Sequence, residues 1–432
     1  MKIAIIGSGI AGNVVAHHLY RDHDITMYES AGHIGGHTHT HSIELDGERH
    51  EIDTGFIVFN DWTYPNFISL LSELNVESQP SAMSFSVRNE RSGLEYNGTN
   101  LNSLFAQRRN LLRPSFHRMI RDILRFNREA SYLIDSNQEI ELGAYLTQHH
   151  YTRQFIDDYL IPMGAAIWST DPARMLSFPA RFFVRFFHNH GMLSVDKRPQ
   201  WRAIRGGSAR YVEKLVAPFS NRIRLNAPVE TVRRMPDRVM VKARGAEAER
   251  YDQVFLACHS DQALRLLTDV TSVEREVVGA IAYQENEAVL HTDTSLLPRT
   301  RRAWAAWNYH VPDTARLAHK PRATLTYNMN ILQNLKSRNT FCVTLNHTAK
   351  VARKRILKRL TYHHPLYTPD SVAAQQRQHE VNGVNRSYFC GAYWRYGFHE
   401  DGVVSALNAL QHFALRQLDQ TAHAQRHLSR VA

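Results

Sequence analysis

A glycine-rich turn close to the N-terminus places the strongest constraint on the fold of this chain. It follows a short apolar run, residues 2–6, and reads Gly-Ser-Gly-Ile-Ala-Gly over residues 7–12. In a strand, turn and helix of this kind, Gly7 permits the tight turn, Gly9 lets the backbone approach a pyrophosphate, and Gly12 lets the helix pack on the strand. We therefore predict a buried parallel strand and a helix whose N-terminus receives the phosphates of a dinucleotide.

The residues after this turn support the same interpretation. Helical spacing continues from Ala11 to Leu19, and a second strand-like run, ITMYES, then ends in Glu29. An acidic residue roughly 20 positions after the first glycine is typical of a side chain that accepts hydrogen bonds from a ribose. The alternative is a glycine-rich surface turn without a ligand, and the ordered strand, helix and acidic residue disfavour it. The motif by itself fits both NAD and FAD.

Length and composition bound the class of protein. The 432 residues are 43% hydrophobic and 22% charged, which suffices for two or three globular domains. Cys258, Cys342 and Cys390 lie in apolar surroundings without CxxC spacing, so neither a disulfide framework nor a zinc site is predicted. The N-terminal apolar run is too short for a signal peptide, and no stretch reaches the ~20 apolar residues of a membrane span. We expect a cytoplasmic protein, either soluble or peripheral at the inner face of the membrane.

The formal net charge of +11 favours anionic partners such as phospholipid surfaces or acyl carboxylates. A basic amphipathic helix is predicted to begin near Pro114, and the run ARFFVRFFHNH over residues 180–190 interleaves arginines with phenylalanines. The arginines in and before this helix are Arg108, Arg109, Arg113, Arg118, Arg121 and Arg125. Such segments can lie on an anionic membrane, although packing on their own domain is the commoner outcome. No nucleic-acid-binding module accompanies the charge, so no nucleic-acid partner is predicted.

The order of patterns along the chain predicts an α/β protein with a discontinuous dinucleotide-binding domain. Strand-like runs of the dinucleotide-binding type occur at the start, in the middle and at the end, and residues 101–191 between them are mostly helical in pattern. A hairpin turn is predicted at Ser92-Gly93. We assign residues 1–75, 196–284 and 370–432 to the dinucleotide-binding domain, and residues 76–195 and 285–369 to a substrate or cap domain.

At this point the sequence resembles a known group, the FAD-dependent flavin amine oxidase and phytoene-desaturase-like superfamily. Within it, the chain is similar to the bacterial branch of predicted NAD/FAD-binding proteins. The resemblance spans nearly the whole chain and rests on IAIIGSGIAG, YESAGHIGGHT, EIDTGFIVFN, IRGGSARYV, FLACHSDQAL, LPRTRRAWAAWNY and YFCGAYWRYGFHEDG, in that order. It implies a Rossmann-like FAD-binding domain of the glutathione-reductase type, with an inserted, discontinuous α+β substrate domain.

The resemblance selects FAD as the cofactor. In this superfamily a glycine pair follows the acidic residue and wraps the pyrophosphate, and here Gly35-Gly36 follows Glu29. Adjacent glycines let successive backbone N–H groups close around phosphate oxygens. The terminal segment is expected to pass the flavin, and a helix from Val403 would direct its N-terminus at the flavin pyrimidine ring. The cofactor-binding residues that the resemblance implies are Gly7, Gly9, Ala11, Gly12, Glu29, Gly35, Gly36, His37, Val229, Gly391, Glu400 and Asp401.

One departure from the family pattern concerns the ribityl chain. Many relatives have an acidic residue just after the glycine that ends the last strand, whereas this chain has Ala392-Tyr393 there. Acidic residues follow only later, at Glu400 and Asp401. No position supports covalent attachment of the flavin, because Cys390 lies inside the strand.

A flavin accepts hydride at N5, so the protein supplies mainly orientation, electrostatics and exclusion of water. No serine elbow, HExxH motif or carboxylate pair indicates another chemistry. Candidates for a wall or proton-transfer role in the terminal turn are Tyr393, Trp394, Tyr396, His399 and Glu400, with ordinary packing as the alternative for the aromatic residues. His259 and Asp53 are weaker candidates, since capping of a helix or turn explains each equally well.

Three histidines in GGHTHTH, His37, His39 and His41, would share one face of an extended strand. A metal site is one interpretation of this spacing. A polar strand face beside the flavin is the favoured one, because no distant ligand is apparent. We expect no metal.

The substrate is expected to bind in the inserted regions. Apolar side chains there could line a tunnel or form the core of the helical domain, and they are Phe155, Tyr159, Ile161, Met163, Ile167, Trp168, Phe178, Phe182 and Phe183. The resemblance implies acyl or isoprenoid substrates, because desaturase-like relatives act on such chains and the narrower branch is associated with cyclopropane or methylated fatty-acid metabolism. We therefore predict a desaturase or oxidase in lipid metabolism, with the electron acceptor left open. The alternatives are a small-amine oxidase and a non-catalytic, FAD-stabilised lipid-binding or assembly protein.

Overall fold

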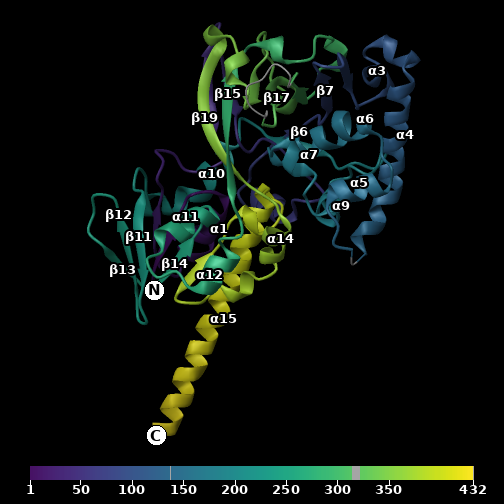
Figure 1. Cartoon of the computed structure of the whole chain (residues 1–432). Coiled ribbons are helices and arrows are strands. Elements are labelled where there is room, and N and C mark those ends of the chain that lie inside the picture. Colours follow the sequence, from purple (N-terminus) through teal and green to yellow (C-terminus); the bar gives the residue numbers. More distant parts are fainter. Residues whose placement is uncertain (137, 314–321, 432) are drawn as a thin grey trace.

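The structure is a computed structural model that describes residues 1–136, 138–313 and 322–431. Residues 314–321, which belong to the second segment assigned to the substrate domain, lie outside the described residues. Two units share one chain: a lower one around a parallel sheet, and an upper one around a second sheet and a group of helices (Figure 1).

The lower unit is built on a five-stranded sheet in the order β10-β2-β1-β14-β20, with all pairs parallel. Its strands are β1 (Lys2–Ile6), β2 (Asp24–Tyr28), β10 (Ile223–Arg224), β14 (Gln253–Leu256) and β20 (Ser387–Phe389). Most residues of the central strands are apolar and buried, because both faces of the sheet are covered. Ile3 and Ile5 pack toward α1 (Ile10–Leu19) and α15 (His399–Val431), whereas Ala4 and Ile6 pack toward the opposite layer.

The opposite layer is a three-stranded antiparallel sheet, β11 (Val229–Arg234), β12 (Val239–Ala243) and β13 (Glu249–Tyr251). Two short helices, α11 (Ser260–Leu266) and α12 (Ser272–Val277), complete it. The layered arrangement confirms the predicted fold class and the strands at residues 2–6 and in ITMYES. The first helix begins at Ile10, one residue before its predicted start.

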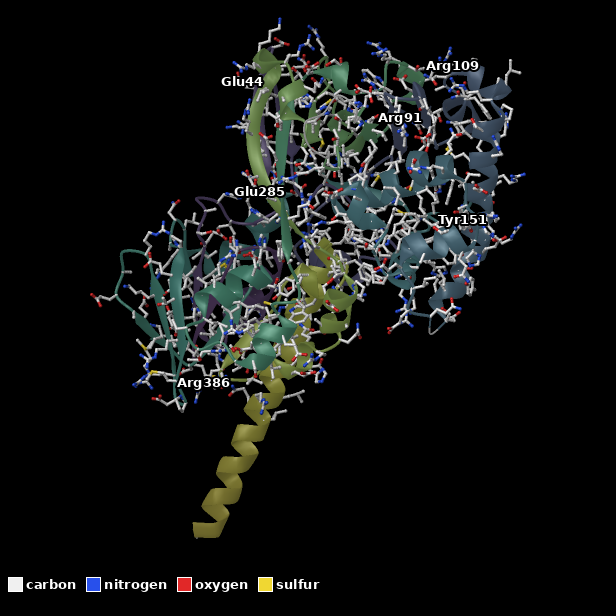
Figure 2. All side chains as sticks on the ribbon, in the orientation of Figure 1. Glu44, Arg91, Arg109, Tyr151, Glu285 and Arg386 are labelled. Atoms are coloured by element: carbon white, nitrogen blue, oxygen red, sulfur yellow. The ribbon has the colours of Figure 1, made fainter. Side chains whose placement is uncertain are left out.

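The upper unit contains a seven-stranded sheet in the order β19-β15-β18-β17-β16-β7-β8. Its strands are β7 (Phe85–Asn89), β8 (Leu94–Asn97), β15 (Tyr283–His291), β16 (Trp307–Val311), β17 (Leu325–Asn328), β18 (Cys342–Leu345) and β19 (Ile356–Pro365). The predicted hairpin turn at Ser92-Gly93 joins β7 to β8. The long pair β15 and β19 runs from the upper unit down to the lower one (Figure 1), and Glu285 lies near this junction (Figure 2).

Helices cover one side of this sheet, as the pattern over residues 101–191 predicts. They are α3 (Leu101–Leu104), α4 (Pro114–Glu129), α5 (Leu142–Gln148), α6 (Arg153–Phe155), α7 (Ile161–Trp168), α8 (Pro172–Met175) and α9 (Ala180–Asn189). A π-helical turn, Ile156–Leu160, joins α6 to α7. Aromatic and aliphatic side chains of α4 to α9 form one core cluster with Val87 and Tyr96 of the sheet.

Smaller elements complete the two units. They are the hairpin β3 (Thr40–Leu45) and β4 (Glu48–Asp53), a sheet of β5 (Phe59–Asn60), β9 (Trp201–Ile204) and β6 (Ser78–Pro80), and helices α2 (Pro65–Glu73), α10 (Ala209–Val216), α13 (Met329–Leu332) and α14 (Pro369–Gln375). The domain boundaries remain a proposal. Strand β6, which we assigned to the substrate domain, pairs with β9, which we assigned to the dinucleotide-binding domain.

Three further findings bear on the predictions. The terminal helix begins at His399 and not at Val403, so four more residues belong to its first turn. Cys258, Cys342 and Cys390 are free thiols. Among the described residues, no helix is both long and apolar enough to cross a bilayer.

Candidate functional site

A cavity of about 1120 Å³ extends from the β1–α1 turn into the upper unit. Its lower end is lined by the turn and by the ends of β2 and β14, and its far end by the seven-stranded sheet and the helices. Lining residues at the lower end include Gly7, Ser8, Gly9, Glu29, Gly36 and Val229. Those at the far end include Tyr159, Met163, Ile167, Trp168, Trp307 and Tyr327.

The three glycines of the first turn have different reasons to be glycine. A Cβ on Gly12 would lie 2.0 Å from the Gly7 carbonyl oxygen, and a Cβ on Gly7, at φ +104°, would lie 2.7 Å from the Ala257 oxygen. Gly9 has ordinary φ, and a Cβ there would meet no atom within 4 Å. The positive φ and the contact with Ala257 explain Gly7, and the close packing of α1 on the turn explains Gly12, whereas only a ligand against the turn explains Gly9.

Glu29 ties the end of β2 to this turn. Its Oε2 accepts hydrogen bonds from Ser8 N at 3.0 Å and Ser8 Oγ at 2.6 Å, and its Oε1 accepts one from Ala31 N at 2.8 Å. Its Oε1 also accepts a longer hydrogen bond from Ser30 Oγ at 3.2 Å, so the roughly four acceptor positions of a carboxylate are all used within the protein. Glu29 thus shapes the turn and also lines the space beside it.

The second glycine turn lies directly against the first. Gly35 and Gly36 have φ of +120° and +59°, and a Cβ on Gly36 would be 3.2 Å from Gly9 Cα. Gly35 N donates to the Ser8 oxygen at 3.0 Å. The Gly35 N–H thus ties the two glycine turns together, and the positive φ of both glycines gives a backbone turn that an anion can approach closely. Val229 lines the same end of the cavity, as do Ala11 and Gly391, and Gly12 lies behind the turn.

His399, the first residue of α15, is buried in the cavity wall. Its ring stacks on Phe56 at 3.7 Å between centroids, and its Nε2 shares a hydrogen bond of 2.6 Å with Tyr211 Oη. Burial lowers the pKa of His399 to about 3. The imidazole is therefore neutral at physiological pH and is held in one orientation, which makes it a poor proton donor.

Glu400 and Asp401 do not line the cavity, contrary to the expectation for cofactor binding and proton transfer. Glu400 accepts hydrogen bonds from Asn66 N at 3.1 Å and Phe67 N at 2.9 Å, at the start of α2. Asp401 accepts hydrogen bonds from the backbone N–H groups of Tyr396 and Phe398. Both carboxylates satisfy unpaired N–H groups, which is why they point away from the cavity.

Trp394 also lies outside the cavity lining, because its indole packs in the core between the parallel sheet and the β11–β13 layer. Its Nε1 donates to the Phe389 oxygen at 3.1 Å. Tyr393 and Tyr396 do line the cavity, and Tyr393 Oη is buried without a hydrogen-bond partner among the described residues. Ordinary packing therefore describes Trp394.

Phe398, which the sequence analysis did not select, lines the cavity beside Tyr396. Both rings pack against Phe186 of α9, at 5.1 Å and 5.4 Å between centroids. The Trp168 indole N–H donates to the Tyr396 oxygen at 3.3 Å. Side chains of the helical region thus close the terminal turn from above, and no local pattern in the sequence indicates this contact.

A group of neutral histidines surrounds the middle of the cavity. His37 lies 5.6 Å from His364 and 6.1 Å from His259 between ring centroids. Burial, followed by the proximity of other histidines, lowers the pKa of His259 and His364 to about 3, and burial lowers that of His37 to about 4. The sequence analysis missed His364, because β19 is remote from the other members in the chain.

The predicted alignment of three histidines on one face is wrong. His39 stacks on His33 at 3.9 Å between ring centroids and lies tilted against His41 at 4.0 Å, whereas His37 turns toward β19. Within the described ranges, no group of histidine, cysteine and acidic side chains has the geometry of a metal site.

The two weaker candidates both have capping roles. Asp53 is buried outside the cavity lining and accepts hydrogen bonds from Ser208 N at 2.9 Å, Ser208 Oγ at 2.7 Å and Thr40 Oγ1 at 2.5 Å. His259 precedes α11, and its backbone N–H donates to Gln262 Oε1 at 3.2 Å. His259 nevertheless lines the cavity, so capping does not describe it completely.

The far end of the cavity is apolar, and the predicted tunnel residues divide into two sets. Tyr159, Met163, Ile167 and Trp168 line the cavity. The remaining five, Phe155, Ile161, Phe178, Phe182 and Phe183, pack in or against the core of the helical region. Among the described lining residues, Glu29 at the nucleotide end is the only carboxylate, and Arg198 and Arg265 are the only lysine or arginine side chains.

Residues 10–293 match the family model described as flavin containing amine oxidoreductase. No curated protein matches the chain. Similar solved structures include cyclohexylamine oxidase from Brevibacterium oxydans IH-35A, with a TM-score of 0.70, 13% identity and coverage of 97% of this chain and 99% of that one.

Two other solved structures are similar over a comparable length. A fatty acid isomerase from P. acnes that produces CLA has a TM-score of 0.66 at 14% identity, covering 95% of this chain and 98% of that one. A putrescine oxidase with bound putrescine has a TM-score of 0.66 at 14% identity, covering 96% and 99%. At such identities the likeness shows a shared fold.

Proposed function

The chain belongs to the flavin-containing amine oxidoreductase family, and from this premise we propose that it oxidises an apolar chain, such as a fatty-acyl or isoprenoid lipid. The protein is an FAD-dependent oxidoreductase. The observation that carries the proposed substrate is the far end of the cavity, where aromatic and aliphatic side chains dominate and no described lining residue is acidic. Such a lining stabilises an apolar chain by removing it from water.

The residues of the lower end fit FAD. Gly9 leaves open space where a side chain would stand, and residues of both glycine turns line the cavity beside that space. We propose that these turns hold the pyrophosphate, that Glu29 accepts a hydrogen bond from the ribose in place of the longer one from Ser30 Oγ, and that the backbone at Val229 contacts the adenine. When bound, FAD supplies the hydride acceptor, its N5 atom.

The residues beyond the nucleotide end would orient the substrate and exclude water. Phe398 and Tyr396, held by Phe186, form one apolar wall, and the N-terminus of α15 contributes the positive end of a helix dipole near His399. A preorganised dipole of this kind stabilises negative charge that develops during hydride transfer. The buried neutral histidines add orientable polar groups without adding charge.

An amine substrate is the alternative, since two of the similar structures are a cyclohexylamine oxidase and a putrescine oxidase. A protonated amine in a buried site needs a carboxylate or a dense aromatic cage to offset its desolvation. The cavity places its one described carboxylate, Glu29, at the nucleotide end, and the net charge of +11 repels cations. Both features favour a neutral or anionic substrate.

Anaerobic rapid mixing tests this choice. The flavin-loaded enzyme would be mixed with a set of fatty acids and isoprenoid alcohols and, separately, with putrescine and cyclohexylamine. We expect loss of the oxidised-flavin absorbance with the lipids only. Reduction by the amines alone would refute the proposed substrate class, and reduction by neither set would favour the non-catalytic alternative.

We propose in addition that the protein contacts an anionic membrane through the outer surface of α3 and α4. The arginine face, as we name it, comprises Arg108, Arg109, Arg118, Arg121 and Arg128 with Leu101, Leu111, Leu112 and Leu124. All of these side chains are exposed, and Leu112 is 88% exposed. Helix α4 lies at the outer edge of the molecule (Figure 1), and Arg109 is labelled near its upper end (Figure 2).

The position of the cavity supports a lipid surface as the partner of the arginine face. Gly98 and Thr99 are exposed and also line the cavity, and they directly precede α3. A chain leaving the bilayer at this face would therefore meet an opening of the cavity. Exposed leucines among arginines combine apolar insertion with attraction to anionic lipids.

A further inference from the structure

Arg198 is distinctive among the residues that line the cavity. It is exposed to solvent and lines the cavity at the same time, so it lies at an opening. The other lining arginine, Arg265, pairs with Asp261 at 2.8 Å near the nucleotide end. Among the described residues Arg198 has no acidic partner, and its Nε donates only to the Ser194 oxygen at 3.2 Å.

The backbone around Arg198 is folded so that the side chain faces the cavity. Gly191, at φ +66°, begins the loop, and a Cβ there would lie 2.8 Å from Pro199 Cδ and 3.1 Å from the Lys197 oxygen. The loop therefore closes tightly on itself. Pro199 and Gln200, on the C-terminal side of Arg198, also line the cavity, whereas the neighbouring Lys197 does not.

The surroundings of Arg198 change from charged to apolar within a short distance. Tyr159, on the π-helical turn between α6 and α7, lines the same cavity; burial raises the pKa of its hydroxyl to about 12, and the positive charge of Arg198 partly opposes this. Beyond it lie Met163 and Ile167. The far end of the cavity thus has one permanent positive charge at an opening, followed by an apolar chamber.

We infer that Arg198 binds the anionic head group of the substrate, a carboxylate or a phosphate ester, and that the apolar chain extends from it past Tyr159 into the cavity. This inference rests on the proposed function and narrows its substrate class from apolar chains to anionic ones. A guanidinium presents paired N–H donors that match a carboxylate or phosphate. An anionic group would be costly to bury in the chamber itself, so it would remain at the opening, where water and Arg198 reach it.

Equilibrium titration of the flavin-loaded enzyme tests this inference independently of turnover. The probes are myristate, its methyl ester and tetradecyl phosphate, each kept below its micelle concentration and followed by tryptophan fluorescence. We expect the wild type to bind at least one anionic probe about tenfold more tightly than the ester, since a hydrogen bond to a charged group is worth that much. Arg198→Gln should abolish the preference without changing ester affinity, and Arg198→Lys should keep part of it.

Lys197→Gln is the matched control, because it removes the same charge from the same loop outside the cavity lining. We expect it to keep the preference. If Lys197→Gln also loses the preference for anionic probes, the preference depends on the overall positive charge and not on Arg198, and the inference is overturned. Flavin content reports folding in every variant.

The outcomes separate this inference from the proposed function. If the ester and both anionic probes bind equally well to the wild type, or if Arg198→Gln keeps the preference, the role of Arg198 is wrong while an apolar substrate stands. If no probe binds to the flavin-loaded enzyme, the proposed function fails and this inference fails with it. Preference for the phosphate or the carboxylate identifies the head group.

Discussion

Gly9 is the residue whose identity the packing of the protein does not explain. Its neighbours Gly7 and Gly12 are glycine because any side chain would collide with backbone atoms at 2.7 Å and 2.0 Å. A side chain on Gly9 would instead extend into open space that lines the cavity. A bound dinucleotide is the physical reason for a glycine there.

This difference gives a prediction for flavin loading. The purified protein should be yellow and release intact FAD on denaturation, and Gly9→Val should abolish loading while the apoprotein remains folded. Gly12→Val, in contrast, should lower the melting temperature whether or not FAD is added. Flavin absorbance per protein and thermal unfolding measure both effects. Full flavin content in Gly9→Val would show that the cofactor lies elsewhere.

The terminal turn gives a second prediction at this scale. Trp394→Ala should destabilise the protein by about 3–5 kcal/mol, the usual cost of removing a buried large aromatic side chain, with an unchanged rate of flavin reduction. Phe398→Ala should slow flavin reduction by a substrate more than it alters FAD affinity, because Phe398 lines the cavity. Anaerobic reduction kinetics and melting temperatures of the two variants distinguish a packing role from a role in the site. The reverse pattern would assign the site to Trp394.

Helix α4 packs one face on its own domain and exposes the other, and the exposed face is the one that we propose contacts a membrane. Phe116, Met119 and Phe126 are buried against the domain, while Arg118 and Arg121 point to solvent. Arg125 differs from them, because its guanidinium lies 4.0 Å from the centre of the Tyr151 ring and donates to the His149 oxygen. Arg125 therefore stabilises the helical region and is unsuitable for a test of membrane binding.

Replacing Arg118, Arg121 and Arg128 by glutamate should abolish sedimentation with anionic vesicles and leave flavin content intact. Binding by the wild type should weaken as salt is added, because the Debye length falls to about 8 Å at physiological ionic strength. A charge-matched control replaces the exposed Arg233, Arg244 and Arg250 of the β11–β13 layer. Equal loss of binding in both triple variants, or equal wild-type binding to neutral vesicles, would argue against the arginine face.

Sequence patterns located the elements better than the contacts between them. The strand at residues 2–6, the hairpin at Ser92-Gly93 and the helix from Pro114 follow from local spacing and turn residues, and each was confirmed. The start of α15 was placed four residues late, because His399 is stabilised by a distant Tyr211 that no local pattern indicates. The contact of Glu400 with the start of α2 is equally remote in sequence, so no local pattern indicates it.

The site as a whole also has one part that local sequence patterns predict and another that depends on contacts between distant segments. The nucleotide end could be predicted because the residues that form it lie within short stretches around Gly9 and Gly36. The middle and the far end are assembled from segments remote in sequence, so His364, Phe398 and Arg198 became apparent only in the folded chain. Their neighbours are set by how the seven-stranded sheet and the helices meet the terminal turn.

Buried neutral histidines give the whole molecule a predicted sensitivity to acid. Burial lowers the pKa of His190 and His291 to about 4 and that of His399 to about 3, from an ordinary value of 6.5. Between these values the unfolded chain binds protons that the native protein does not, so stability should fall as the pH falls below 6.5. Urea denaturation across this range measures the effect. A free energy of unfolding that does not change with pH would contradict the neutral, buried state of these side chains.

Product analysis after a single turnover tests the central claim most directly. The flavin-loaded enzyme would be mixed without oxygen with a lipid that bleaches its flavin, and the extracted lipid would be analysed by mass spectrometry. Hydride transfer to the flavin with loss of a proton predicts one bleached flavin for each lipid molecule that has become lighter by a pair of hydrogens. A lipid of unchanged mass, or bleaching by amines in place of lipids, would contradict the account.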